Sequence, residues 1–202
     1  MPGTANTTAQ TSSRWRHLPN AITLLRIALV LPLVVSIARR DFDTALILVI
    51  VAGISDALDG LLAKRCGWQS WLGGVLDPIA DKTLLVACFV TLSLVGVIPK
   101  WLMWLVVGRD VVIAAGAAIY HFLIGRVVPQ PSMLSKITTC LQIFFVIAKL
   151  VWPARDVGDN TFDLPMASIT VLTALATLAS GLHYVIVWSH KAREVWAQRV
   201  RR

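Results

Sequence analysis

The sequence is poor in charged residues. Asp, Glu, Lys and Arg make up 15% of the 202 residues, against about a quarter in ordinary soluble domains. Hydrophobic residues make up 56%, and the mean hydropathy is +0.71. The apolar residues come in long uninterrupted runs rather than in stripes, which favours a bilayer over a soluble core. We therefore predict an integral membrane protein.

Cysteine, histidine and acidic residues are also scarce. Cys66, Cys88 and Cys140 have no metal-ligand spacing and no necessary pairing, which argues against a zinc site or a disulfide framework. The 11 acidic residues are outnumbered by 19 basic ones, giving a net charge of +8. These basic residues stand at the ends of apolar runs, so they predict anchoring at a membrane surface and exclude a nucleic-acid-binding face.

Six apolar runs approach the roughly 20 residues that a helix needs to cross the hydrocarbon core. We expect helices because unpaired backbone groups cannot face lipid. The polar residues 1–17 are predicted to be disordered and lack the apolar stretch of a secretory signal. Residues 18–190 are predicted to form one membrane domain, and residues 191–202 a basic tail on anionic headgroups. The predicted spans cover about 21–38, 44–59, 74–97, 101–123, 134–152 and 165–188.

The distribution of Lys and Arg predicts the orientation. A cytoplasmic N-terminus collects most of the basic residues, including Lys64, Arg65, Lys136 and the C-terminal tail, on the cytoplasmic side. The expected fold is therefore an all-α integral membrane protein with six transmembrane helices and both termini in the cytoplasm. We expect it in a bacterial inner membrane, with its acidic segment on the cytoplasmic face.

Four aspartates stand out in this apolar chain. Asp56 and Asp59 are three residues apart at the end of the second run, and Asp77 and Asp81 are four apart at the start of the third. Each pair shares one face of a helix, so two antiparallel neighbours would bring the four carboxylates together. All-oxygen ligation favours Mg²⁺, followed by Mn²⁺ or Ca²⁺. The alternative is that each pair is simply solvated or ion-paired at a helix end.

The residues around the aspartates suit a phosphorylated ligand. Gly60 and the pair Gly73 and Gly74 leave room for a bulky group, and Lys64 and Arg65 add positive charge for a diphosphate. Metal ions beside basic residues predict phosphoryl-transfer chemistry. Taken singly, the glycines would be packing residues and the basic residues membrane anchors.

The segment from Asp56 to Asp81 resembles the signature of the CDP-alcohol phosphatidyltransferase family, Asp-x2-Asp-Gly-x2-Ala-Arg-x8-Gly-x3-Asp-x3-Asp, with Lys64 where the family usually has Arg. The resemblance implies transfer of the phosphatidyl group from CDP-diacylglycerol to an alcohol, with release of CMP, at two Mg²⁺ or Mn²⁺ ions. Asp56 and Asp77 would bridge both ions, Asp59 would complete one, and Asp81 would contact the other and act as general base.

Further residues follow from the same resemblance. Gly60, Lys64 and Ser70 would contact the CDP-diacylglycerol headgroup. Asn20 and Thr23, with Arg26 nearby, resemble the segment that helps to hold the nucleotide, although either residue could instead cap a helix. A homodimer is the assembly that the family implies.

The segments around Arg109-Asp110 and Ser135-Lys136 resemble the glycerol-lipid branch of the family, which holds phosphatidylglycerophosphate synthases and CMP-forming cardiolipin synthases. Arg109 and Lys136 would bind the acceptor phosphate, with glycerol-3-phosphate as the first expectation and phosphatidylglycerol as the alternative. Arg109 and Asp110 could also be an internal ion pair. A transporter or scaffold is the competing class, but a transporter would place ionisable residues at mid-membrane, and packing does not require Asp81.

Overall fold

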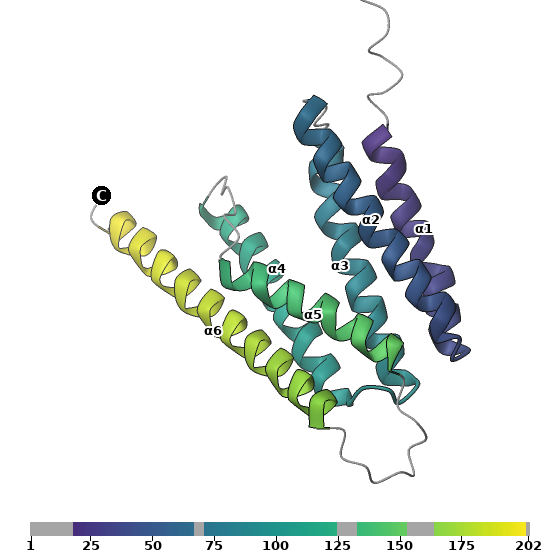
Figure 1. Ribbon diagram of the computed structural model, residues 1–202. Coiled ribbons are helices and arrows are strands. Elements are labelled where there is room, and N and C mark those ends of the chain that lie inside the picture. Colours follow the sequence, from purple (N-terminus) through teal and green to yellow (C-terminus); the bar gives the residue numbers. More distant parts are fainter. Residues whose placement is uncertain (1–17, 67–70, 125–132, 153–163, 201–202) are drawn as a thin grey trace, which may run out of the picture. The chain divides into compact units, whose positions relative to one another are not determined.

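The computed structural model describes residues 18–66, 71–124, 133–152 and 164–200, with side chains for 24–55, 82–116, 133–152, 164–187 and Ser189. The residues that it describes form six helices (Figure 1), which confirms the predicted all-α fold. The prediction for residues 1–17 falls outside the described residues. The helices are α1 (Leu18–Ala38), α2 (Phe42–Cys66), α3 (Trp71–Leu94), α4 (Lys100–Ile124), α5 (Met133–Val151) and α6 (Leu164–Val200).

Two helices continue well past the C-terminal ends of their predicted spans. Helix α2 continues to Cys66, beyond the span predicted to end near residue 59, so Lys64 and Arg65 belong to the helix. The residues after Gly60 are mostly Leu, Ala, Lys and Arg, which are good helix formers. Helix α6 likewise continues to Val200, so the basic residues 191–200 prolong the last helix.

Two of the described helices have the length and composition of membrane-spanning segments. Helix α5 and the stretch Leu164–Val187 of α6 are each long and apolar enough to cross a bilayer. Shorter apolar stretches cover Leu24–Ala38, Phe42–Ser55 and Lys82–Leu94. Along α6, large apolar side chains are exposed in successive turns, as lipid contact would favour: Val171, Leu172, Leu175, Leu178, Leu182, Val185 and Ile186.

The chain divides into two compact units, Met1–Cys88 and Phe89–Arg202. In the first unit, α1 packs against α2. The buried residues of α1 include Leu33 and Ile37, and those of α2 are Ala45, Val49 and Ala52. The spacing of three, four and seven residues places each set on one face of its helix. These buried residues are apolar and several are small. Among the side chains that the structure describes, Arg26, seven residues before Leu33 on α1, is the one buried ionisable residue beside them.

A tight turn joins α1 to α2. Arg40 adopts a left-handed conformation with φ of 60°. Its N–H donates to the Ile37 carbonyl at 2.9 Å, and the Asp41 N–H donates to the Ser36 carbonyl at 2.9 Å, which is the Schellman pattern of helix termination. Asp41 then caps α2, because its Oδ1 accepts from the Thr44 N–H at 3.2 Å. Hydrogen bonds from the Thr44 side chain and backbone lower the pKa of Asp41.

In the second unit, the end of α3 and the helices α4 to α6 form an apolar core. The rings of Phe89 and Phe145 stack with centroids 5.7 Å apart, and α4 and α5 both pack against α6. Gly96 ends α3 with φ of 82°, where a side chain would be strained. The Val97 N–H donates to the Leu92 carbonyl at 2.9 Å, which completes a second Schellman turn before α4.

Candidate functional site

The four predicted metal ligands lie on two helices. Asp56 and Asp59 belong to α2, and Asp77 and Asp81 to α3; their side chains fall outside the described set. Residues three or four apart on a continuous helix have Cβ atoms about 5–6 Å apart, so each helix presents one pair of carboxylates on one face. Such an oxygen-only donor set fits Mg²⁺ or Mn²⁺. Among the side chains that the structure does describe, no group of three or more His, Cys, Asp or Glu could hold a metal ion.

The residues predicted to hold the nucleotide lie on α1 and α2. Gly60 and Lys64 are within α2, and Ser70 lies outside the described residues. Asn20 and Thr23 come after Leu18, the first residue of α1. A capping residue precedes the first helical residue, so the position of Thr23, five residues into the helix, does not suit the capping alternative. The role of Asn20 and Thr23 as nucleotide contacts stays a prediction.

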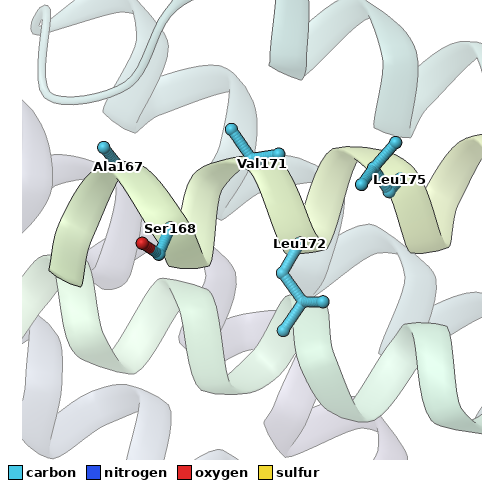
Figure 2. Close-up of a pocket in the computed structure, with 5 residues that line it drawn as sticks. All are labelled: Ala167, Ser168, Val171, Leu172 and Leu175. Atoms are coloured by element: carbon cyan, nitrogen blue, oxygen red, sulfur yellow. The ribbon is translucent and has the colours of Figure 1, made fainter. Parts of the chain in front are cut away.

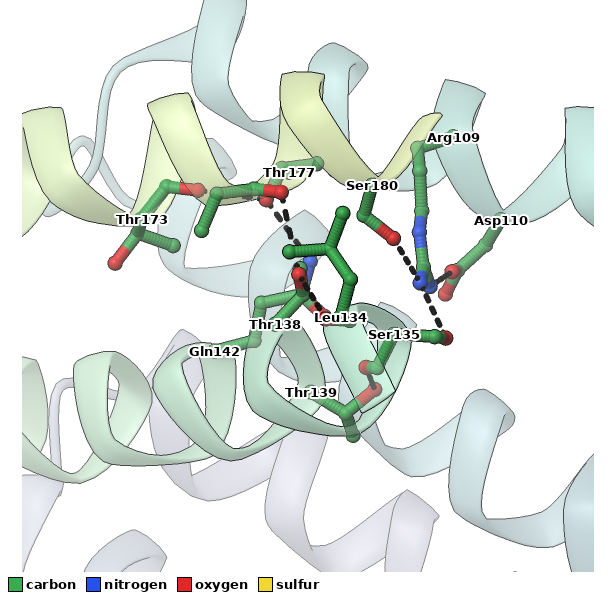
Figure 3. Close-up of polar contacts among 11 residues, drawn as sticks. Arg109, Asp110, Leu134, Ser135, Thr138, Thr139, Gln142, Thr173, Thr177 and Ser180 are labelled. Carbon is green, nitrogen blue, oxygen red and sulfur yellow. Dashed lines mark hydrogen bonds and ion pairs between the residues drawn. The ribbon is translucent and has the colours of Figure 1, made fainter. Parts of the chain in front are cut away.

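Arg109 lies at the centre of a hydrogen-bonded cluster between three helices (Figure 3). Its Nη1 donates to Asp110 Oδ1 at 2.6 Å. Its Nη2 donates to Ser135 Oγ of α5 at 2.7 Å and to Ser180 Oγ of α6 at 2.8 Å. Only 5% of Arg109 is exposed. The guanidinium therefore joins α4, α5 and α6 through one buried group, and the ion pair that the sequence left open is present.

Lys136 has a different environment from Arg109, although we predicted both as acceptor-binding cations. Lys136 is exposed in the first turn of α5, whereas Arg109 is buried. The two residues are connected through Ser135, which precedes Lys136 and accepts a hydrogen bond from Arg109.

Polar contacts also form a row between α5 and α6, which the sequence did not lead us to predict. Gln142 Nε2 donates to Thr177 Oγ1 at 3.1 Å. The Thr138 hydroxyl donates to the Leu134 carbonyl of α5 at 2.8 Å and also lies 3.2 Å from the Ala176 carbonyl of α6. Figure 3 displays these contacts beside the Arg109 cluster. Polar residues recur at 135, 138 and 142 and again at 173, 177 and 180. This helical spacing inside two apolar runs was the available signal, since polar residues in membrane helices commonly bond across helix interfaces.

An open hollow lies along α6 (Figure 2). It is lined by Ala167, Ser168, Val171, Leu172 and Leu175. Ser168 Oγ donates to the Leu164 carbonyl of the same helix at 2.7 Å. The lining residues carry no ionisable group, so the hollow is not a candidate for the reaction.

The apolar helices and their length define a multi-pass integral membrane protein. Residues 16–196 match the family model described as CDP-alcohol phosphatidyltransferase. The chain belongs to this family of membrane enzymes, which are transferases of phospholipid biosynthesis.

Relatives of two kinds are similar to the chain. The CMP-forming cardiolipin synthase of Homo sapiens is 30% identical over 201 residues, which cover 90% of this chain and 65% of that protein. The CDP-diacylglycerol–glycerol-3-phosphate 3-phosphatidyltransferase of Bacillus subtilis is 30% identical over 185 residues, covering 83% and 93% of the two chains. This chain thus spans slightly less than two thirds of the human relative and nearly all of the bacterial one. The equal identities do not distinguish the two acceptors.

Proposed function

We propose that this protein transfers the phosphatidyl group of CDP-diacylglycerol to a glycerol-type alcohol and releases CMP. The observation that carries the proposal is the family's complete carboxylate motif from Asp56 to Asp81, with one pair of aspartates on each of two helices. The family match over residues 16–196 supports it, as do relatives named for CDP-diacylglycerol or for CMP formation.

The four aspartates would hold two divalent metal ions, a cofactor that the family uses. Asp56, Asp59, Asp77 and Asp81 would supply the carboxylate ligands of these ions. Bound Mg²⁺ or Mn²⁺ would supply charge neutralisation at the diphosphate oxygens.

The side chains of this protein perform the remaining steps. Asp81 takes the proton from the acceptor hydroxyl, whose oxygen then bonds to the phosphatidyl phosphorus while the bond from phosphorus to the CMP oxygen breaks. Gly60 leaves space for the headgroup, and Lys64 and Ser70 contact it. Lys64 supplies a point charge where an arginine would supply a two-pronged contact. On α1, Asn20 and Thr23 hold the nucleotide.

We assign glycerol-3-phosphate as the acceptor, so that the product is phosphatidylglycerophosphate. Phosphatidylglycerol is the second candidate, supported by the cardiolipin synthase relative. Both acceptors carry a phosphate, and Arg109 and Lys136 are the cations assigned to the acceptor side of the reaction.

The proposed topology follows the distribution of charge. Six helices would span a bacterial inner membrane with both termini in the cytoplasm, and the aspartates would lie at the cytoplasmic face. Residues 18–190 form the proposed catalytic membrane domain, and residues 191–202 the basic tail on anionic headgroups. A homodimer is the proposed assembly.

The experiment that tests the function is a CMP-release assay on purified protein in detergent with CDP-diacylglycerol and Mg²⁺. Glycerol-3-phosphate, phosphatidylglycerol, serine and inositol phosphate are supplied one at a time. We expect CMP release with glycerol-3-phosphate, loss of release in chelator, and recovery on adding Mg²⁺ or Mn²⁺. Release with phosphatidylglycerol alone would reassign the acceptor, and undiminished release in chelator would contradict the metal ions.

A further inference from the structure

The hydrogen bonds of Arg109 leave little of the guanidinium for a substrate. Both hydrogens of Nη2 are directed to Ser135 and Ser180, and Nη1 lies 2.6 Å from an Asp110 oxygen. Two N–H donors remain, the second hydrogen of Nη1 and Nε, and Nε is buried and has no hydrogen-bond partner. A phosphate could reach Arg109 only by displacing the Asp110 carboxylate or a serine hydroxyl from a buried cluster, at the cost of exposing or unpairing charge. The geometry therefore suits a structural cation.

Lys136 has the properties that Arg109 lacks. It is exposed, and an ammonium on a flexible stem can follow an incoming phosphate. It also lies in the first turn of α5, where the backbone N–H groups have no partner within the helix and the turn tends to fray. The position of Lys136 therefore depends on what holds that turn in place.

Ser135 and Thr138 hold this turn against the neighbouring helices. Ser135 Oγ accepts from Arg109, whose other Nη2 hydrogen is directed to Ser180 of α6. One turn later, the Thr138 hydroxyl donates to the Leu134 carbonyl of its own helix at 2.8 Å and makes a longer contact of 3.2 Å with the Ala176 carbonyl of α6. Both anchors lie within three residues of Lys136, and Arg109 supplies the one that is closer in sequence.

We propose that Arg109 is a positioning residue that acts through Ser135, and that Lys136 is the residue that contacts the acceptor phosphate. This inference rests on the proposed function. The sequence assigned phosphate binding to both Arg109 and Lys136, and the inference gives that role to Lys136 alone. It predicts that removing the Ser135 hydroxyl weakens binding of the acceptor, because Lys136 is no longer held in place. The binding of CDP-diacylglycerol should stay unchanged.

The test is a kinetic double-mutant cycle with Ser135→Ala and Lys136→Met. We expect each single variant to raise the KM for the phosphate-bearing acceptor on the order of 10-fold, as for a lost hydrogen bond or contact with a charged group. The KM for CDP-diacylglycerol should stay unchanged. In the double variant the two effects should not multiply, because Ser135 acts only through Lys136. Ser135→Thr, which keeps a hydroxyl, should restore most of the acceptor KM.

Ser168→Ala is the matched control, because Ser168 is an exposed serine whose hydroxyl bonds its own helix; it should leave both KM values unchanged. Effects of Ser135→Ala and Lys136→Met that multiply, or a wild-type acceptor KM in Ser135→Ala, would overturn the proposal. If Ser135→Ala does not fold, Ser180→Ala removes another anchor of the same guanidinium and serves in the same cycle.

Amide hydrogen exchange separates this inference from the proposed function. In Ser135→Ala, the backbone of residues 133–139 should exchange faster than in the wild-type protein, while α1 and α2 exchange as before. Unchanged exchange in this turn would overturn the positioning role. A wild-type protein that releases no CMP with any acceptor would contradict the proposed function, and the exchange measurement would still decide whether Arg109 holds the turn.

Discussion

The helix pair α1–α2 and the group α4–α5–α6 are held together by different kinds of contact. In α1 and α2, the buried residues that the structure describes are aliphatic or small, such as Leu33, Ile37 and Ala52, with the single exception of Arg26. Between α4, α5 and α6, the buried positions include Arg109, Gln142 and several hydroxyl side chains. In lipid, apolar contacts gain mainly from close packing, whereas polar contacts are directional and fix how one helix faces another. The second group is therefore held in a specific register by its hydrogen bonds.

The two regions also differ in where ionisable residues stand. The acidic motif starts on α2 and continues on α3. In the proposed reaction its carboxylates bind metal ions. Arg109 and Asp110 on α4 neutralise each other. Substitutions in the motif should therefore abolish CMP release and leave the free energy of unfolding unchanged. Substitutions in the α4–α6 cluster should mainly lower the free energy of unfolding.

The largest effect is expected for Asp81→Asn. Loss of the general base should lower the rate of CMP release by about 10²- to 10⁴-fold, while an amide of the same shape preserves the fold and CDP-diacylglycerol binding. The rate is measured by CMP release, and folding by thermal unfolding in detergent. Wild-type turnover in this variant would contradict the assigned base.

Arg109→Gln tests the opposite behaviour. Removing one partner of a buried ion pair costs about 3–5 kcal/mol, so the free energy of unfolding should fall by that order. The double variant Arg109→Gln with Asp110→Asn should recover part of the loss, because no buried charge then lacks its counter-ion. SDS titration in mixed micelles measures both. An unchanged unfolding curve for Arg109→Gln would show that the cluster does not stabilise the group.

Ile37→Ala tests the apolar pair α1–α2. Ile37 is fully buried, and the cavity should reduce the free energy of unfolding by about 2 kcal/mol. Ile47→Ala is the matched control, because Ile47 is 61% exposed and its truncation should cost less than about 0.5 kcal/mol. Equal effects of the two variants, measured by the same SDS titration, would mean that close packing does not hold this pair.

The smallest effect is expected at the turn between α1 and α2. The pKa of Asp41 is lowered from its ordinary value of 3.8 by hydrogen bonds from Thr44. The ionised form is therefore favoured by folding, and its contribution to stability is complete above 3.8 and is lost as the pH falls through the lower pKa of the folded state. Thermal unfolding between neutral and acidic pH should show a slightly steeper loss for the wild-type protein than for Asp41→Asn.

The sequence predicted the number and approximate extent of the helices because uninterrupted apolar runs are a local property of the chain. Helix α1 begins at Leu18, where we predicted the span from about 21, and α4 begins at Lys100, where we predicted about 101. The end of α2 was missed because a change from apolar to basic residues at Lys64 marks a membrane surface and does not by itself end a helix.

The acidic motif and the polar cluster differed in how well they could be predicted. The motif lies within a stretch of 26 residues, so its spacing on the chain was sufficient to name Asp56, Asp59, Asp77 and Asp81. The cluster brings Arg109 to Ser180, 71 residues away. The spacing of polar residues marks a polar face on α5 and on α6, but it does not specify that Arg109 of α4 meets both faces.

The sequence by itself determined that this protein is an α-helical membrane protein and a member of the CDP-alcohol phosphatidyltransferase family, because hydropathy and a short motif of fixed spacing are both properties of the linear chain. Only the tertiary structure decided whether Arg109 is paired internally or available to a ligand. A basic residue beside an acidic one in an apolar helix can bind a ligand or be neutralised internally. The packing of α4 and α5 against α6 places two serine hydroxyls within 2.8 Å of its guanidinium and buries the ion pair among them.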